Sequence, residues 1–261
     1  MAKALVEEGK SPILLVDADP DQNLAEMVGI DLKEAGKSPI LLVDADPDQN
    51  LAEMVGTDLK EVGKFTIADL IVSTFIEGGG TTVGVPPTQR IESRIWEKGL
   101  YEGQHFDFLG VGTKWIEGCY CMPNTALKGA LENLTKNYEY VLIDSPAGLE
   151  NLNRRITSSV DDIFDILDHS KKSQDHVRRA VKIIQEVDMQ YKNFYIVGGY
   201  RFPDELGKQA EEALKFKYLG KIAQDSLLDD YVLNGKSLID LPNDNEAYLS
   251  VKNVLKNLGY L

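Results

Sequence analysis

A tandem duplication near the start of the chain limits the folds that the chain can adopt. Residues 9–35 and 36–62 are two copies of one unit, and they differ at only two positions, Ile30 against Thr57 and Ala35 against Val62. Each copy contains an apolar run, the acidic turn DADPD and a helix-like segment. Short apolar runs that alternate with helical patterns are typical of βαβ units and a parallel sheet.

The two copies predict two strands and two helices. We expect strands at Ile13–Asp17 and Ile40–Asp44, because a short apolar run between turn signals suits a strand that is buried on both faces. Helices are expected at Asn23–Lys33 and Asn50–Lys60, each with its leading Asn as a cap. Two units are too few for a solenoid, and the repeat does not continue after Lys64, so a local βαβ arrangement is favoured.

The rest of the chain continues the alternation of strands and helices. Strands are expected at 106–111, 138–144, 163–167, 194–197 and 216–222, and helices at 91–99, 124–136, 174–187, 204–214, 227–233 and 248–258. Residues 118–123 are expected to form a turn and residues 77–88 a loop. The pattern predicts an α/β fold, a single doubly wound, mostly parallel sheet of about seven strands with helices on both faces. Because no linker divides the chain, we expect one domain over residues 1–261.

Charge and targeting signals exclude several classes of partner. The chain has 28 basic and 42 acidic residues, a net charge of −14, whereas broad contact with nucleic acid or anionic lipid needs a positive surface. We therefore expect no nucleic-acid partner and no membrane partner. No apolar run is long enough to span a membrane, and the start, MAKALVEEGK, lacks the apolar core of a signal peptide. The two cysteines and this start favour a cytoplasmic location.

Acidic residues follow several predicted strands, where ligands bind in doubly wound sheets. Asp144 ends the run YVLID and precedes Ser145. A carboxylate at this place commonly holds Mg²⁺ through water beside a nucleotide phosphate, although it can also simply cap the next turn. Asp44 and Asp46, like the equivalent pair of the first copy, can orient water for attack on a γ-phosphate. The alternative is turn chemistry, since Asp and Pro favour turns.

Both cysteines of the chain lie in one Cys-x-Cys motif, at Cys119 and Cys121. Thiolates two positions apart in an extended turn can point at one ion, but two ligands do not complete a tetrahedral shell. A twofold dimer would bring four thiolates together. Such a site accepts Zn²⁺ readily, whereas nickel prefers square-planar geometry. Two unrelated small residues or a redox pair are the alternatives; the position on a predicted loop favours metal.

The chain lacks a standard phosphate loop, Gly-x-x-x-x-Gly-Lys-Ser/Thr. Gly-Lys-Ser begins at Gly9, Gly36 and Gly235, but none of these glycines has another glycine five residues before it. None of the three segments is therefore expected to hold a phosphate group.

Three segments together carry a family resemblance: LLVDADPDQNL, GCYC and YVLIDSPAGLENLNRR. They resemble the MinD/ParA-type ATPases with a deviant Walker A loop, and within that group the nickel-insertion accessory ATPases of carbon monoxide dehydrogenase and acetyl-CoA synthase (CooC type). The resemblance implies a P-loop NTPase fold, ATP with Mg²⁺ as cofactor, a homodimer and a nickel enzyme as partner.

The resemblance also implies roles for individual residues. Water activation falls to Asp44 and Asp46, and the Mg²⁺ and phosphate side to Asp144 and Ser145. Arg201 lies on the adenine side. The two thiols of Cys-x-Cys, Cys119 and Cys121, bind Ni²⁺ or Zn²⁺ across the dimer.

The chain departs from this family at its start. The family has a strand, a Lys-Gly-Gly-x-Gly-Lys-Thr-Thr loop and a helix that runs into a segment like AKALVEEGKSP. Here the first copy follows that segment, and we hypothesise that Ile13–Lys33 restores the βαβ topology with DADPDQN in place of the phosphate loop. Its three carboxylates would repel phosphate. A second departure is Gly198-Gly199-Tyr200, where related proteins usually have an Asn that reads adenine.

These observations lead to one expected function and two alternatives. We expect a metal-binding homodimer with weak or no ATPase activity that serves nickel-cluster maturation. The alternatives are a MinD/ParA-like partitioning ATPase and a reductase similar to the nitrogenase iron protein.

Overall fold

The strands of the protein form one eight-stranded sheet, in the order β3-β4-β2-β5-β1-β6-β7-β8. The computed structural model describes residues 13–17, 40–45, 51–74, 84–103, 106–112, 121–138, 140–145 and 159–260. The strands are β1 (Ile13–Asp17), β2 (Ile40–Asp44), β3 (Tyr101–Glu102), β4 (Asp107–Gly110), β5 (Tyr140–Asp144), β6 (Ser159–Leu167), β7 (Gln190–Gly198) and β8 (Lys217–Lys221). Only the β3–β4 pair is antiparallel among the strand pairs described. The predicted mostly parallel sheet is confirmed, with one strand more than expected.

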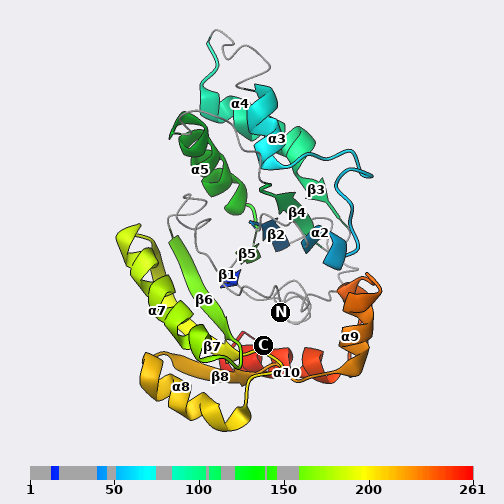
Figure 1. Ribbon diagram of the computed structural model, residues 1–261. Helices are drawn as coiled ribbons and strands as arrows, with labels where there is room; N and C mark the ends of the chain where they lie inside the picture. The colour runs from blue at the N-terminus through cyan, green and yellow to red at the C-terminus, as the bar shows by residue number, and fades with distance from the viewer. Residues whose placement is uncertain are drawn as a thin grey trace.

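Helices cover both faces of this sheet (Figure 1). The longer helices are α3 (Ile67–Val72), α4 (Pro87–Arg94), α5 (Cys121–Thr135), α7 (Lys171–Glu186), α8 (Gly207–Leu214), α9 (Ser226–Leu233) and α10 (Glu246–Asn257). The short ones are α2 (Leu51–Met54), the π-helix η3 (Ile95–Gly99) and the 3₁₀ turns η4 (Asp204–Leu206) and η5 (Leu238–Asp240).

Alternation along the strands divides the core into two layers. Leu41 and Val43 of β2 belong to the layer that contains α3, α4, α5, α7 and α8. Ile40 and Leu42 belong to the layer that contains α2, α9 and α10. Successive side chains of a strand point to opposite faces, so an uninterrupted apolar run such as ILLV supplies both layers. The prediction that this run is buried on both faces is therefore confirmed for β2.

The two copies of the duplicated unit lie on either side of one strand. β1, from the first copy, is parallel to β5 and β6, and β2, from the second copy, is parallel to β4 and β5. Ile13 and Ile40 are both level with Tyr140. The expected pair of parallel strands is confirmed, whereas residues 18–39 between them, with the helix expected at Asn23–Lys33, lie outside the described residues.

The structure corrects two expectations about helices. The helix expected at Asn50–Lys60 ends at Met54, because Gly56 takes a left-handed conformation, with φ of 74°, that ends helices. Cys121–Pro123 do not form a turn, since α5 begins at Cys121. Pro123 is tolerated there because the amide groups of a first helical turn have no partner within the helix.

Several boundaries also differ from their expected positions. β6 and β7 begin at Ser159 and Gln190, well before the apolar residues that predicted them. Their first halves are largely polar, but they pair residue for residue with each other, as at Ser159 and Gln190. Backbone pairing therefore extends both strands beyond their hydrophobic signal.

Candidate functional site

Three strands end in an aspartate at one level of the sheet. Asp144 of β5 is level with Asp44 of β2 on one side and with Asp17 of β1 on the other. Neighbouring strands lie about 4.8 Å apart, so the three backbones form a continuous acidic edge. Ligands of doubly wound sheets bind outside the carboxyl ends of the strands. This edge, which we call the acidic edge, is therefore the candidate functional site.

Asp44 is held in place by the elements around it. Its side chain is 1% exposed, and its Oδ2 accepts a hydrogen bond from the backbone N–H of Leu51 at 3.2 Å, at the start of α2. Its backbone carbonyl accepts from Val111 at 2.8 Å. A carboxylate at a helix N-terminus is favoured by the helix dipole. The turn interaction considered for Asp44 is thus present, and it fixes the carboxylate at the end of β2.

Asp144 and Ser145 end the neighbouring strand and are also buried. Asp144 is 7% exposed and Ser145 is 1% exposed. The backbone carbonyl of Asp144 accepts a hydrogen bond from Ala45 at 2.9 Å, which ties the ends of β2 and β5 together. Among the described residues, the Ser145 hydroxyl has no hydrogen-bond partner. A buried hydroxyl without a partner is unfavourable unless a ligand or water completes it.

The carboxylates of the acidic edge are better ligands for a hydrated magnesium ion than for a bare phosphate group. Mg²⁺ prefers carboxylate and water oxygens, and Asp44 and Asp144 provide carboxylates at one level. Phosphate needs backbone N–H donors or cations instead. The segment after β1 that would supply them, residues 18–22, lies outside the described residues.

The turn after β7 explains why the chain lacks an adenine-reading Asn there. A Cβ atom added to Gly198 would lie 2.9 Å from the Cβ of Lys221, the Cδ1 of Phe202 and the hydroxyl of Tyr218. Real Cβ atoms do not approach other atoms so closely, so packing excludes a larger residue at this position. The rings of Phe202 and Tyr218 are tilted against each other with centroids 5.9 Å apart.

Arg201 lies in the same turn and is exposed. Its guanidinium carbon is 5.0 Å from the centroid of the Tyr200 ring, within the range of a cation–π contact. The two side chains therefore offer a stacked surface rather than a pocket with fixed hydrogen-bond donors.

Two of the predicted site residues lie outside the described residues, and a third is described only in its backbone. Asp46 and Cys119 belong to the first group. Cys121 is the first residue of α5, so it does not sit in the extended turn on which the metal argument relied. Within the described part of the chain, no group of three or more His, Cys, Asp or Glu side chains could hold a metal ion.

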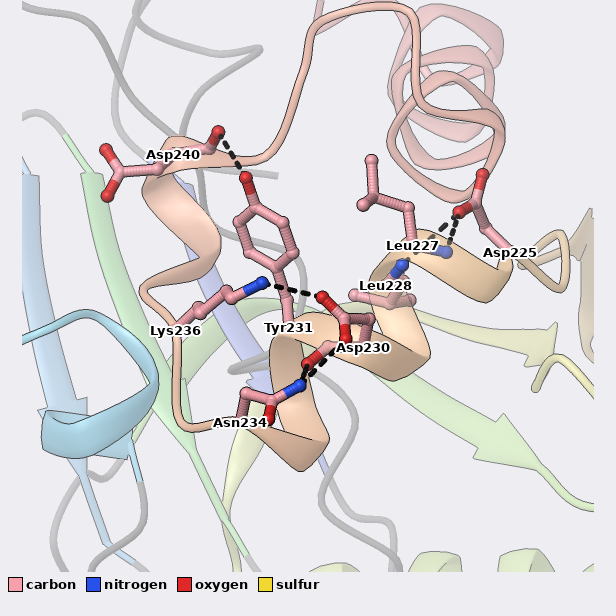
Figure 2. A network of polar contacts seen from close by, with 8 residues as sticks. All are labelled: Asp225, Leu227, Leu228, Asp230, Tyr231, Asn234, Lys236 and Asp240. Carbon is pink, nitrogen blue, oxygen red and sulfur yellow. Dashed lines mark hydrogen bonds and ion pairs between the residues drawn. The ribbon is translucent and has the colours of Figure 1, made fainter.

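The third Gly-Lys-Ser segment begins at Gly235 and connects α9 with η5 (Figure 2). Its lysine contacts residues of α9 instead of being available to a phosphate group. Lys236 forms an ion pair with Asp230 at 2.6 Å, and its Nζ lies 5.2 Å from the centroid of the Tyr231 ring. Tyr231 in turn donates to the backbone carbonyl of Asp240 at 3.3 Å. The lysine therefore helps to fold the segment back onto α9.

Sequence reasoning missed two buried polar groups away from the acidic edge. Tyr138 donates to Asp107 Oδ2 at 2.6 Å. Burial raises the pKa of Asp107 above its ordinary value, and the bond from Tyr138 offsets only part of this rise. Asp162 accepts from Asn193 Nδ2 at 2.6 Å and from the Tyr260 hydroxyl, and burial raises its pKa. The only available signal was an acidic residue inside an apolar run.

One further finding concerns membranes. Among the described residues, no helix combines the length and the apolar composition that crossing a bilayer requires.

Comparison with known proteins finds one matching family and two similar archaeal proteins. Residues 32–196 match the AAA domain family, a segment that contains the second copy and only the end of the first. An uncharacterized ATP-binding protein of Methanocaldococcus jannaschii is 33% identical over 99% of this chain and 90% of its own length. A second uncharacterized ATP-binding protein of that organism is 31% identical over 40% of this chain and 48% of its own length.

Solved structures share the fold at lower sequence identity. The ParA family ATPase of Chlorobium tepidum superposes with a TM-score of 0.67 at 12% identity, over 95% of this chain and 99% of that chain. The MinD cell division protein of Aquifex aeolicus superposes with a TM-score of 0.64 at 21% identity, over 95% of this chain and 97% of that chain.

Proposed function

Because this chain belongs to the AAA domain family and has the fold of the MinD/ParA-type ATPases, we propose that it binds ATP with Mg²⁺ at the acidic edge and does not turn it over efficiently. The observation that supports the proposal is the level pair Asp44 and Asp144 beside the buried Ser145 hydroxyl. The ATP-binding relative that aligns with nearly the whole chain supports the choice of nucleotide.

The residues of the acidic edge have distinct parts in this proposal. Asp144 holds Mg²⁺ through water, and the Ser145 hydroxyl completes its hydrogen bonding on the ion's water or on a phosphate oxygen. The Mg²⁺ ion, when bound, neutralises charge on the phosphates. Asp44 and Asp46 orient an attacking water molecule. Of these, Asp44 is already held by the N–H of Leu51, which restricts its carboxylate to one geometry.

Efficient hydrolysis is not expected, because the sequence carries no phosphate loop. The three Gly-Lys-Ser segments all lack the first glycine of the motif, and Lys236 of the third is paired with Asp230. Catalysis of phosphoryl transfer depends almost entirely on positioning and on neutralising the phosphate charge. The acidic sequence DADPDQN at and after the end of β1 carries no cation, so Mg²⁺ is left as the main source of positive charge.

Calorimetric titration of the full chain with ATP tests the proposal. With Mg²⁺ and enough salt to screen surface charge, we expect a dissociation constant on the order of 0.1–1 mM, and no binding when Mg²⁺ is chelated. Asp144→Asn should weaken binding by about tenfold or more. Asp229→Asn, an exposed carboxylate on α9, is the matched control and should bind like the parent.

Two results would contradict this proposal. Absence of heat at saturating Mg-ATP would rule out the nucleotide site. Repeated turnover of ATP that Asp44→Asn abolishes would rule out the inactive state and restore the ATP-driven mechanism implied by the resemblance.

The adenine side is proposed to tolerate different bases. Gly198 cannot carry a reading side chain, and Arg201 over Tyr200 offers a stacking surface. Stacking discriminates poorly between bases, whereas buried hydrogen bonds discriminate strongly. GTP should therefore compete with ATP at similar concentration. A preference for ATP of about tenfold or more would indicate that other groups read the base.

A second candidate function is metal binding by a homodimer through Cys119 and Cys121, in nickel-cluster maturation of an enzyme such as carbon monoxide dehydrogenase or acetyl-CoA synthase. It is favoured by the placement of both cysteines of the chain in one Cys-x-Cys motif. Ni²⁺ and Zn²⁺ remain the candidate ions, and the cytoplasm is the proposed location. Replacement of both cysteines by serine should remove bound metal and weaken the dimer; unchanged metal content would exclude this site.

A partitioning role is the remaining candidate, and the comparisons support it better than nickel maturation. One of the similar structures is a ParA family ATPase and another is a MinD cell division protein. A reductase similar to the nitrogenase iron protein has no support from these relatives. Absorbance near 400 nm in anaerobically purified protein would be needed to revive it.

A further inference from the structure

The carboxyl ends of the strands leave one direction for a nucleotide that binds at the acidic edge. On the β4 side, the carbonyl of Val111 accepts from the N–H of Ala68 in α3 at 2.9 Å. A Cβ atom at Gly112 would lie 2.5 Å from the Oγ1 of Thr66, so α3 covers the end of β4. On the other side, β1 and β6 separate β5 from β7. Three strand spacings place the end of β7 about 14 Å from Asp144, within the length of an extended nucleoside triphosphate.

The backbone of the turn after β7 is engaged in hydrogen bonds with its neighbours. The N–H of Gly199 donates to the carbonyl of Leu167 at 2.8 Å. The carbonyl of Gly198 accepts from the N–H of Ile222 at 2.8 Å. The carbonyl of Gly199 accepts from the N–H of Phe202 at 2.9 Å. These bonds tie the ends of β6, β7 and β8 together, so hydrogen bonds to a base fall to the side chains around the turn.

Two of the polar side chains around this turn already have partners. Lys221 pairs with Asp204 at 3.3 Å, and the guanidinium of Arg201 lies over the ring of Tyr200. Tyr218 of β8 differs from them, because its hydroxyl forms no hydrogen bond within the described part of the chain. This hydroxyl is therefore available to a ligand.

Packing fixes the ring of Tyr218. Two glycines make room for it: a Cβ atom at Gly207 would lie 2.8 Å from its Cδ1, and one at Gly198 would lie 2.9 Å from its hydroxyl oxygen. The ring is tilted against that of Phe202, with centroids 5.9 Å apart. The backbone N–H of Tyr218 donates to the Glu211 carboxylate at 3.2 Å. The hydroxyl is thus held beside the last residue of β7, at the carboxyl end of the sheet.

A protonated phenol can both donate and accept a hydrogen bond. Burial, with a smaller contribution from Asp204, raises the pKa of Tyr218 to about 12, so its hydroxyl keeps the proton at neutral pH. Adenine carries an amino donor on C6, whereas guanine carries a carbonyl acceptor there. The hydroxyl can accept from the first and donate to the second, in agreement with a site that binds ATP and GTP similarly.

We propose that the Tyr218 hydroxyl forms a hydrogen bond with the group on C6 of a bound purine, so that the site takes purine nucleoside triphosphates and discriminates against pyrimidine ones. The inference rests on the proposed function, which brings a nucleotide to the acidic edge, and it adds the residue that selects the class of base. The corresponding group of a pyrimidine lies closer to the sugar, because the ring is smaller. A hydroxyl that is fixed by packing cannot follow it.

Calorimetric titration of the full chain with four nucleotides in Mg²⁺ tests the proposal: ATP, GTP, CTP and purine riboside triphosphate, which carries only hydrogen on C6. We expect ATP and GTP to bind with similar dissociation constants. Purine riboside triphosphate should bind about three- to tenfold more weakly, as expected for the loss of one hydrogen bond, and CTP at least as weakly. Tyr218→Phe should weaken the binding of ATP and GTP by the same factor and leave that of purine riboside triphosphate unchanged.

The result for purine riboside triphosphate separates a contact with the base from a structural role, because a disturbed site would weaken the binding of every purine nucleotide. Tyr191→Phe removes a hydroxyl near the amino end of β7, far from the turn, and is the matched control. This variant should bind all four nucleotides like the parent.

Equal binding of ATP and purine riboside triphosphate by the parent would overturn the proposal, and this comparison needs no variant. Parent-like affinity for ATP in Tyr218→Phe, or CTP bound as tightly as ATP, would also overturn it. In each of these cases nucleotide binding persists, so the proposed function stands. Absence of binding by all four nucleotides would instead remove the proposed function, and this inference with it.

Discussion

A buried polar residue stabilises this protein only where it forms a hydrogen bond with a suitable partner. Asp107 at the start of β4 and Tyr138 before β5 are both buried, and their hydrogen bond of 2.6 Å joins the amino ends of two strands that are not neighbours. Burial raises the pKa of Asp107, and the bond from Tyr138 acts in the opposite direction. A buried carboxylate that lost this donor would keep the full penalty of its desolvation.

Tyr138→Phe removes the donor and leaves the ring in place. We expect a loss of about 1–3 kcal/mol in the free energy of unfolding at pH 7. The pKa of Asp107 should rise further, so the folded state binds a proton more tightly than the unfolded state. Stability then falls as the pH rises above the unfolded value of about 3.9, and the deficit of the variant should be smaller near pH 4 than at pH 7. Urea denaturation at both pH values measures this.

Tyr191→Phe at the half-buried start of β7 is the control for loss of a tyrosine hydroxyl. Equal stability of Tyr138→Phe and the parent at pH 7, within about 0.5 kcal/mol, would show that the bond contributes nothing net.

At the scale of elements, one carboxylate connects the starts of two helices. Asp225 accepts hydrogen bonds from the N–H groups of Leu227 at 2.8 Å and Leu228 at 3.2 Å, in the first turn of α9 (Figure 2). It also accepts from Glu246 at 3.2 Å, at the first residue of α10. Burial alone would raise the pKa of Asp225, but these three backbone bonds together hold it below its ordinary value.

Asp225→Ala should destabilise the protein by about 1–2 kcal/mol at neutral pH, because α9 loses its cap and the first backbone N–H of α10 loses its acceptor. The carboxylate has a lowered pKa in the folded state, so its contribution is complete above the unfolded value of about 3.9 and is lost as the pH falls through the folded value. The difference between variant and parent should thus be constant from pH 5 to pH 8 and shrink in more acidic buffer.

Thermal or urea unfolding across this pH range measures the effect, with Asp229→Ala in the first turn of α9 as the control. A difference that stayed the same down to pH 2 would mean that the loss arises from packing and not from the charge.

Removal of the first copy is the strongest test at the level of elements. Deletion of residues 9–35 leaves every residue of the second copy unchanged but takes β1 from between β5 and β6. One remaining ILLVD strand cannot fill two positions of the sheet, so the deleted chain should lose its cooperative thermal transition. Circular dichroism during heating measures this. A melting temperature equal to that of the parent would mean that β1 is not needed to complete the sheet.

The whole molecule is organised by one sheet that separates two apolar layers. Strands from both ends of the chain contribute to each layer: Val43 and Phe194 belong to one, and Leu42 and Phe164 to the other. No layer is confined to one part of the described chain. A single domain over residues 1–261 stays a prediction, which sequence composition suggested only by the lack of a linker.

A single domain should unfold in one step. We expect the loss of helical signal in the far ultraviolet and the loss of aromatic signal in the near ultraviolet to share one urea midpoint. The separate midpoints of two independent units would contradict the single-domain prediction. Duplicate runs at two protein concentrations are needed, because a dimer would shift both midpoints together.

Local sequence patterns were sufficient for the class of fold. The ILLVD runs, the alternation of strands and helices and the acidic strand ends all follow from side-chain periodicity and turn chemistry, which act over a few residues. They predicted most strands and placed aspartates where a parallel sheet binds ligands. They could not predict the polar halves of β6 and β7, because those residues are held by backbone pairing between Ser159 and Gln190 and not by hydrophobicity.

The tertiary structure alone decided which residues meet. Asp44 and Asp144 lie at one level only because β2 and β5 pair in register, across a separation of a hundred residues in the chain. Tyr138 finds Asp107, and Tyr218 and Phe202 fill the space at Gly198, through contacts between different elements. For two strands with one sequence, the pattern cannot assign their positions beside β5. The handedness of the connection assigns them, because handedness is a property of the folded chain and not of any segment.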